Sequence, residues 1–299
     1  MMRQFFFPLI FLIHTPLQIA NLAVWASLVI IFGVAKLLLP FPILQQRLAS
    51  AMHFFMFCFG KTSVLLIRCF NSVQFEFRVQ GALSKKSWYL ILANHMSYLD
   101  IILLIDFAAE RIPVPKFFLK QELIWLPFVG LGAWALDMPF MRRYSREYLE
   151  KFPHKKGMDI QTTKRFCQKF KLTPTTVINF VEGTRYTAVK HKVRGSQYKH
   201  LLPPKAGGIA FTLATMGELF TNILDISLLY PDNQRHPMLS MLSGQLSRVV
   251  MDVNVLDVPA ESRGDYYIDE QFRGQFHTWL NGLWAAKDAR IAQWMEQKT

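Results

Sequence analysis

The stretch Trp88-Tyr-Leu-Ile-Leu-Ala-Asn-His95-Met-Ser-Tyr-Leu-Asp100 passes from an apolar run into a polar loop. The apolar run is typical of a buried strand, and the polar residues that follow lie where sites collect in α/β proteins. We expect a helix from about Ser97, with Asn94 as its candidate cap. Residues five apart in a regular helix are about 140° apart around the axis, so Asp100 contacts His95 only if the histidine precedes the helix.

His95 and Asp100 form an H-x4-D pair that suits general acid–base chemistry, in which the carboxylate fixes the tautomer of the histidine and stabilises its protonated form. The same spacing occurs from His154 to Asp159, within a Lys-rich stretch that follows no predicted strand. Context therefore favours His95. A histidine satisfied by backbone groups at a strand end is the competing interpretation, and this motif alone does not decide between the two.

Outward from this stretch, short apolar runs alternate with segments of helical periodicity. Strands are expected over 73–79, 88–92, 176–181, 223–229 and 249–255, and helices over 100–109, 145–152, 162–170, 206–219 and 269–296. Such alternation predicts an α/β fold with a mixed, mostly parallel sheet flanked by helices.

The amino-terminal part of the chain is strongly apolar. No charged residue occurs between Arg3 and Lys36, and residues 19–39 form a helix of about 31 Å, which is long enough to span a bilayer. A cleaved signal peptide is the competing interpretation, but the stretch is longer than a signal h-region and ends without a small-residue cleavage site.

A second apolar run follows the helix-breaking pair Pro40 and Pro42, from 48 to 70. Its uncharged part is too short to span, so we expect it to enter one leaflet or to pack against the first helix. The sequence thus predicts a membrane-embedded helix or two-helix hairpin over residues 1–70 and a soluble domain over 71–299.

The net charge of +13 is concentrated in one segment. Residues 142–205 hold 16 Lys or Arg against four acidic residues. A basic block of this density attracts phosphorylated small molecules, nucleic acid or anionic lipid headgroups, and otherwise forms a solvated surface. By the positive-inside tendency it also favours a domain on the cytoplasmic face of the membrane.

A second motif, Phe180-Val-Glu-Gly-Thr-Arg185, follows the predicted strand at 176–181. Gly183 can adopt a positive φ and turn the chain sharply. Glu182 and Arg185 then present a carboxylate and a guanidinium at the sheet edge, where the arginine suits bidentate contact with a phosphate. When the motif is taken alone, a surface salt bridge is the favoured explanation.

Together the motifs resemble the glycerol-phosphate acyltransferase superfamily, specifically the 1-acylglycerol-3-phosphate (lysophosphatidate) acyltransferase, or PlsC, family and its bacterial inner-membrane members. The order and spacing of the blocks agree over about 115 residues. The matched residues are Asn94, His95 and Asp100 in the first block, Lys120 in a K-x-E-L segment, Phe180, Glu182, Gly183, Thr184 and Arg185 in the third block, and Pro204 and Lys205 in the fourth.

The second block departs from the family pattern G-x-x-F-I-x-R. Asp137 stands in place of the glycine and Met141 in place of the isoleucine, whereas Phe140 and Arg143 keep their places. Because this block is associated with binding the acyl acceptor, the substitution leaves the identity of the acceptor headgroup open.

The resemblance implies an acyltransferase that moves a fatty acyl group from acyl-CoA or acyl-carrier protein to a lysophospholipid. His95 is the implied base and Asp100 its orienting acid. The acceptor phosphate is assigned to Lys120, Arg143 and Arg185, with Lys205 as a weaker candidate, and Glu182 fixes Arg185 or contacts the acceptor.

No ligand cluster accompanies His95, so we expect no metal and no cofactor besides the acyl donor. The expected partners are membrane lipids and the two substrates, without nucleic acid, and the expected location is the bacterial inner membrane with the catalytic domain facing the cytoplasm. Two alternatives stay open. One is an acyltransferase for another lyso-lipid, and the other is a membrane-anchored protein that binds nucleic acid or anionic lipid through residues 142–205.

Overall fold

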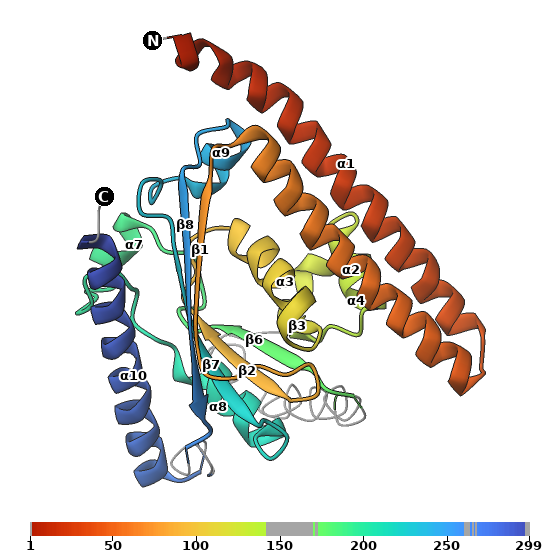
Figure 1. The fold of residues 1–299 in the computed structure, drawn as a ribbon. Helices are drawn as coiled ribbons and strands as arrows, with labels where there is room; N and C mark the ends of the chain where they lie inside the picture. Colours follow the sequence, from red (N-terminus) through yellow and green to blue (C-terminus); the bar gives the residue numbers. More distant parts are fainter. Residues whose placement is uncertain are drawn as a thin grey trace.

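The computed structural model describes residues 2–141, 170, 173–259, 264, 266 and 268–296. A twisted six-stranded sheet crosses the centre of the described structure, and helices lie on both of its faces (Figure 1). The predicted mixed, mostly parallel α/β fold is confirmed.

The sheet has the order β1-β8-β7-β2-β6-β3. Strands β7, β2, β6 and β3 run parallel to one another, and β8 reverses the direction because it pairs with β7 in the antiparallel sense. A separate two-stranded sheet joins β4 and β5. The strands are β1 (Gln74–Gln80), β2 (Tyr89–Ala93), β3 (Pro115–Phe117), β4 (Leu119–Lys120), β5 (Phe140–Met141), β6 (Thr176–Phe180), β7 (Asn222–Leu229) and β8 (Arg248–Asp257).

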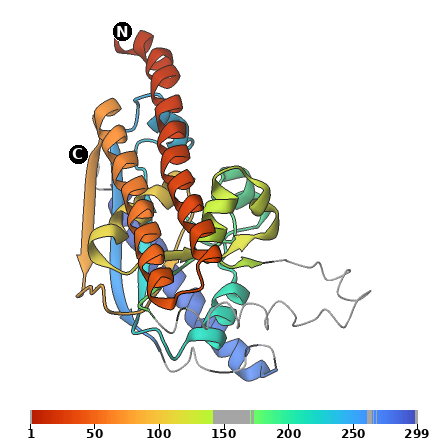
Figure 2. The same ribbon diagram turned by 90° about the vertical axis from the view of Figure 1, so that its right-hand side faces the viewer.

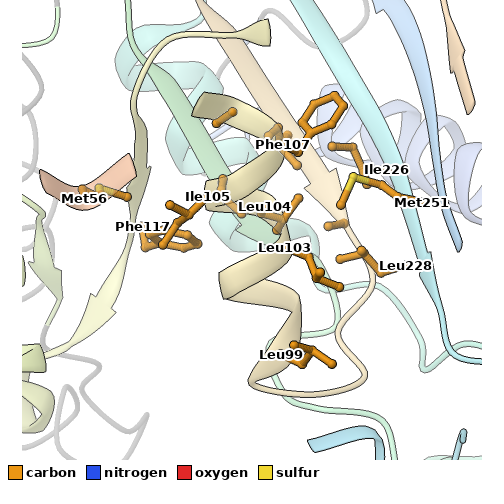
Figure 3. Close-up of a cluster of buried hydrophobic side chains, with 14 of the residues drawn as sticks. Met56, Leu99, Leu103, Leu104, Ile105, Phe107, Phe117, Ile226, Leu228 and Met251 are labelled. Atoms are coloured by element: carbon orange, nitrogen blue, oxygen red, sulfur yellow. The ribbon is translucent and has the colours of Figure 1, made fainter. Parts of the chain in front are cut away.

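Strand β2 is buried on both faces because its side chains alternate between two hydrophobic cores. Ile91 packs toward α3 (Leu99–Arg111) and α2 (Pro42–Phe70), whereas Leu92 packs toward α8 (Ala206–Met216) and α10 (Glu270–Glu296). Figure 3 shows the first core, where side chains of α3 point toward Ile226, Leu228 and Met251 of the neighbouring strands. Shorter helical segments of the described residues are η1 (Gln121–Trp125), α4 (Val129–Ala135), α7 (Ala188–Val193) and α9 (Pro237–Leu242).

Helix α1 (Met2–Leu38) and α2 form a hairpin along one side of the domain (Figures 1 and 2). The turn between them contains Pro40, as the sequence predicts, whereas α2 begins at Pro42, before the apolar run expected from residue 48. Polar side chains join the two helices: the Asn21 amide donates to the Ser63 hydroxyl at 2.8 Å, and the Trp25 indole donates to the Thr62 hydroxyl at 3.0 Å. The predicted packing of the second helix against the first is therefore observed.

Both hairpin helices are longer than predicted. The candidate spans are Phe7–Leu38 and Pro42–Phe70, and by length and composition each is sufficient to cross a membrane. The first helix continues through Pro8 and Pro16 to Met2. The division into a membrane-embedded segment over 1–70 and a soluble domain over 71–299 remains a prediction.

Candidate functional site

The site is built at the carboxyl end of β2, where the chain leaves the sheet before α3 begins at Leu99. His95 lies in this loop, and its Nδ1 is 2.8 Å from Oδ2 of Asp100 in the first turn of α3. The loop placement solves the geometric problem that a five-residue spacing poses within a regular helix. The predicted contact between His95 and Asp100 is observed.

Asp100 is fully buried, and its two oxygens share four donors. Oδ2 accepts the backbone N–H groups of Met96 at 2.7 Å and Ser97 at 2.9 Å in addition to the imidazole of His95. Oδ1 accepts the hydroxyl of Tyr230 at 2.6 Å. Burial, followed by the charge of Asp100, raises the pKa of Tyr230 well above its ordinary value, so the phenol stays a donor.

His95 presents its other ring nitrogen away from the aspartate. Because the Asp100 carboxylate can only accept, it holds the proton on Nδ1 and leaves the lone pair on Nε2. The ring stacks on Phe180 with centroids 4.0 Å apart and 18° between the planes, and its side chain keeps 12% of its exposure. The imidazole is thus oriented by β6 and remains open to a substrate.

Asn94 does not cap α3, although that had been expected. The helix begins at Leu99, two residues after the predicted start near Ser97. The N-terminal flanking residue of α3 is Tyr98, without a side-chain cap. The Asn94 amide instead exchanges two hydrogen bonds with the backbone of Leu228, at 2.8 and 2.9 Å. Asn94 therefore fixes the end of β2 to β7 and acts on His95 only through the backbone.

Glu182 is buried, which corrects the expectation of a carboxylate presented at the sheet edge. Its Oε2 accepts the N–H of His95 at 3.2 Å, and its Oε1 accepts the N–H of Leu202 at 2.9 Å. Burial raises the pKa of Glu182 to about 8, against the opposing effect of these two N–H groups. Glu182 therefore holds the histidine loop and the loop before α8 together, and it is not the partner that positions Arg185.

Arg185 lies on an aromatic platform supplied by the histidine loop. Its guanidinium carbon is 3.9 Å from the ring centroid of Tyr98, a cation–π contact at the surface beside His95. Gly183 has φ +64°, the left-handed conformation expected of this turn. The Lys190 ammonium then donates to the Thr184 hydroxyl at 2.9 Å and to the carbonyl of Arg185 at 3.0 Å, which fixes the turn from α7.

The fourth block forms the loop that enters α8. The N–H of Lys205 donates to the carbonyl of Val181 at 2.8 Å, so this loop lies directly against the Glu182 turn. The Lys205 side chain runs beside Gly183, where an added Cβ would lie 3.1 Å from its Cδ. Pro204 precedes it, half-buried. The first, third and fourth blocks are therefore brought together.

The structure explains why Asp137 can replace the glycine of the family pattern in the second block. Asp137, in the glycine position, has φ +53°, a conformation that Asp tolerates better than most residues. Its carboxylate lies 2.5 Å from the Lys36 ammonium at the end of α1. The aspartate thus keeps a glycine-like backbone while it ties this block to the helical hairpin, a structural role that needs no change of acceptor.

The other candidates are placed only in part. Lys120 ends β4, and Phe140 begins β5 beside it in the two-stranded sheet. Arg143 lies outside the described residues, as do the His154 to Asp159 pair, the predicted helix at 145–152 and, apart from Phe170, the predicted helix at 162–170. The sequence did not predict the contacts of Tyr230 with Asp100, of Phe180 with His95 and of Tyr98 with Arg185. Phe180 had been singled out only as part of its motif.

The family of the chain follows from comparison with known proteins. The family model described as "Acyltransferase" matches residues 74–228, more than half of the chain. The chain belongs to the acyltransferase family. The match begins at β1 and ends within β7, so it contains both the His95 to Asp100 pair and the Glu182 turn.

Relatives in the family carry a specific name. The chain is 25% identical over 213 residues to the 1-acyl-sn-glycerol-3-phosphate acyltransferase delta of Mus musculus, covering 67% of this chain and 51% of the relative. It is 25% identical over 228 residues to 1-acyl-sn-glycerol-3-phosphate acyltransferase 3 of Arabidopsis thaliana, covering 70% and 54%. The chain thus spans about half the length of the curated relatives it matches.

A solved structure shares the fold along nearly all of the chain. The 1-acyl-sn-glycerophosphate (LPA) acyltransferase PlsC from Thermotoga maritima superposes with a TM-score of 0.60 at 16% sequence identity, covering 97% of this chain and 98% of that chain. At this identity the likeness concerns the fold, including the amino-terminal helices.

Proposed function

We propose that the protein transfers a fatty acyl group from acyl-CoA or acyl-carrier protein to the free hydroxyl of a lysophospholipid, with lysophosphatidic acid converted to phosphatidic acid. The observation that carries the proposal is the contact of 2.8 Å between His95 Nδ1 and Asp100 Oδ2, with the histidine side chain still 12% exposed. Membership of the acyltransferase family and the names of the relatives from Mus musculus and Arabidopsis thaliana support it.

In the proposed reaction His95 Nε2 takes the proton of the acceptor hydroxyl as its oxygen attacks the thioester carbonyl carbon. The new C–O bond forms, the C–S bond breaks, and the proton on His95 passes to the departing thiolate. Asp100 stabilises the imidazolium between these steps. No protein nucleophile is needed, because the lipid hydroxyl attacks directly.

The acceptor phosphate is assigned to the basic residues around the histidine. Arg185 stands beside the His95 loop on the Tyr98 ring, so its planar N–H groups are held in place without a carboxylate partner of their own in the contacts described. Lys120 and Arg143 are proposed to complete the phosphate site from the segment that contains β4 and β5. Lys205, beside Gly183, contributes positive charge from the loop before α8.

The proposed location is the bacterial inner membrane, with the α/β domain on the cytoplasmic face. The two apolar helices support membrane attachment. The basic block over 142–205 favours the cytoplasmic side and a surface rich in anionic lipid. Soluble acyl donors then reach the site from the cytoplasm while the acceptor arrives from the bilayer.

The test is an acyl-transfer assay on membranes that contain the full chain, with labelled acyl-CoA or acyl-carrier protein and a panel of lysophospholipids. The variant is His95→Ala, and the matched control is His277→Ala, an exposed histidine on α10. Diacyl product is expected from the wild type and from His277→Ala but not from His95→Ala.

Two results contradict the proposal. Turnover that survives in His95→Ala removes the histidine from the chemistry. No product from any acceptor, with folded protein and both kinds of donor, favours the alternative of a membrane-anchored protein that binds polyanions through residues 142–205.

A further inference from the structure

Residues 123–136, here named the apolar corner, contain no charged side chain (Leu-Ile-Trp-Leu-Pro-Phe-Val-Gly-Leu-Gly-Ala-Trp-Ala-Leu). They include the end of η1 and all of α4, yet many of their large side chains face outward. Trp125 keeps 86% of its exposure, the highest value among the exposed large hydrophobic residues that the structure describes. The other exposed large residues of the corner are Leu126, Phe128, Leu131 and Trp134. Contiguous apolar surface of this kind marks an interaction site.

The conformation of the corner is built to turn apolar side chains outward. Phe128 has φ +62°, rare for a residue with a side chain, and the N–H of Val129 donates to the carbonyl of Pro127 at 2.7 Å to close a three-residue turn. Gly130 then passes so close to η1 that an added Cβ would lie 2.2 Å from the carbonyl oxygen of Ile124. A strained turn that exposes a phenylalanine is retained where the exposed surface has a use.

The corner adjoins the exposed apolar face of α1. The two helices approach through small residues: an added Cβ on Gly33 of α1 would lie 2.4 Å from Cβ of Ala135 in α4. Figures 1 and 2 both show α4 beside α1. Next to this contact on α1, Val34 and Leu37, one and four residues after Gly33, are exposed. The corner therefore extends the apolar surface of α1 to the α/β domain.

We propose that the apolar corner is a third lipid-contacting element, which enters the headgroup and upper acyl region of the same leaflet that α1 contacts. This inference rests on the membrane attachment given under Proposed function. Lipid is the fitting occupant because 14 successive residues lack charge, because the surface continues that of α1, and because its two exposed tryptophans are of the type that favours membrane interfaces.

The position of the corner also affects how the lysophospholipid acceptor reaches the site. It connects Lys120 of β4 to Phe140 of β5, and these two strands pair in the small sheet. Both residues are candidates for acceptor binding. Insertion of the corner holds this small sheet at the level of the lipid headgroups, so that a lysophospholipid reaches the site without leaving the bilayer.

The test uses the full chain with Cys58, Cys69 and Cys167 replaced by serine, reconstituted in phospholipid nanodiscs. Single cysteines at Trp125→Cys, Ile31→Cys or Val193→Cys carry an environment-sensitive fluorophore, and lipids with nitroxides on their acyl chains act as quenchers. Position 31 is the reference on α1, and Val193, exposed on α7, is the matched apolar control. The label at 125 is expected to be quenched like that at 31, and the label at 193 to remain unquenched.

The failures are distinguishable. A label quenched at 31 but not at 125 overturns the inference and leaves a protein partner as the occupant of the corner. Labels unquenched at both positions overturn the membrane attachment itself, and the inference with it. Quenching at all three positions shows that the probe drives insertion, and it likewise overturns the assignment of the corner.

A second measurement connects the corner to turnover. The double variant Trp125→Gln, Leu131→Gln is expected to raise the KM for a long-chain lysophosphatidate in bilayers about tenfold, because apolar contact with lipid is lost. Its activity on a short-chain lysophosphatidate dissolved in water is expected to be unchanged. Equal loss on both substrates contradicts a role in membrane access.

Discussion

Asp100 and Asp225 are both fully buried, and the two carboxylates are compensated in opposite ways. Asp225, in β7, is paired with two cations of α10: its Oδ1 lies 2.6 Å from the Lys287 ammonium, and its Oδ2 accepts from Arg290. Asp100 is surrounded by two backbone N–H groups, a phenol and an imidazole. Among the contacts described, only the second arrangement contains a histidine, a side chain that can both accept and donate a proton in catalysis.

The difference separates a structural carboxylate from one that suits acid–base chemistry. The charge of Asp225 is already neutralised by Lys287 and Arg290. The Lys287 ammonium also donates to the carbonyls of Leu92 and Ile226, and these bonds hold α10 against β2 and β7. Among the contacts described, Asp100 has His95 as its one titratable cation. Its negative charge is therefore available to stabilise an imidazolium. The two sites predict opposite responses to the same substitution.

The largest effect is expected from Asp100→Asn. The amide cannot accept every donor that faces the carboxylate, and it no longer fixes the His95 tautomer, so kcat is expected to fall by about 10³- to 10⁴-fold. The acyl-transfer assay measures the loss, and circular dichroism with a thermal melt verifies the fold. A loss below about tenfold in a folded variant contradicts the proposed role of Asp100.

Asp225→Asn is expected to reduce stability and spare the chemistry. Burial already lowers the pKa of Lys287, with Asp225 as the main opposing influence, so removal of the carboxylate leaves a buried cation without its anion. The free energy of unfolding is expected to fall by about 3–5 kcal/mol, with kcat of the folded fraction changed only a few-fold. Thermal unfolding in detergent measures the first quantity. The double variant Asp225→Asn, Lys287→Met is expected to recover part of the lost stability. A double variant no more stable than Asp225→Asn would contradict the pairing of Asp225 with Lys287.

Much of the fold was predictable from the sequence because its strands are short, apolar and β-branched. The five expected strands all appear, with ends shifted by one or two residues. Strand β3 was missed because Pro115-Lys-Phe117 carries a proline and a lysine and offers no alternation. Strands β4 and β5 are only two residues long, too short for any periodic signal.

The His95 to Asp100 contact was predictable because both residues belong to one local segment. Tyr230 was not predictable, because its contact with Asp100 joins residues 130 apart and depends on the strand order β7-β2. The inward direction of Glu182 was missed for the same reason. Its partners are backbone N–H groups of two distant loops, which have no signature in the sequence.

Glu182 adds a third buried carboxylate to the comparison, and in the described part of the chain its oxygens accept from two backbone N–H groups. With a folded pKa of about 8 against an ordinary value of 4.5, the folded state keeps a proton that the unfolded state loses between these pH values. The free energy of unfolding should therefore fall as pH rises through this window, by several kcal/mol at most, and level off above pH ~8.

Glu182→Gln isolates this contribution because the amide does not titrate. Thermal unfolding of both proteins is measured from pH 4.5 to 9 in detergent. The stability of the wild type is expected to fall across this range, and that of the variant to fall less. The amide also mismatches one N–H group, which gives an offset that does not depend on pH. Parallel curves would mean that Glu182 is ionised throughout, stabilised by its two N–H donors.

Tyr230→Phe tests the uncharged hydrogen-bond donor of Asp100, and it is the smallest change among these variants. It removes one donor of 2.6 Å to the carboxylate and leaves the aromatic packing intact. Because Asp100 is negative both before and during proton transfer, most of the stabilisation from this bond is common to both states, so kcat is expected to change by less than about tenfold. A less stabilised carboxylate attracts a proton on His95 more strongly, so the acid limb of the pH–activity profile is expected to shift to higher pH. A purely structural role would lower the melting temperature and leave that limb in place. The shift of the limb therefore decides whether Tyr230 acts through Asp100 on the chemistry or only fills the core.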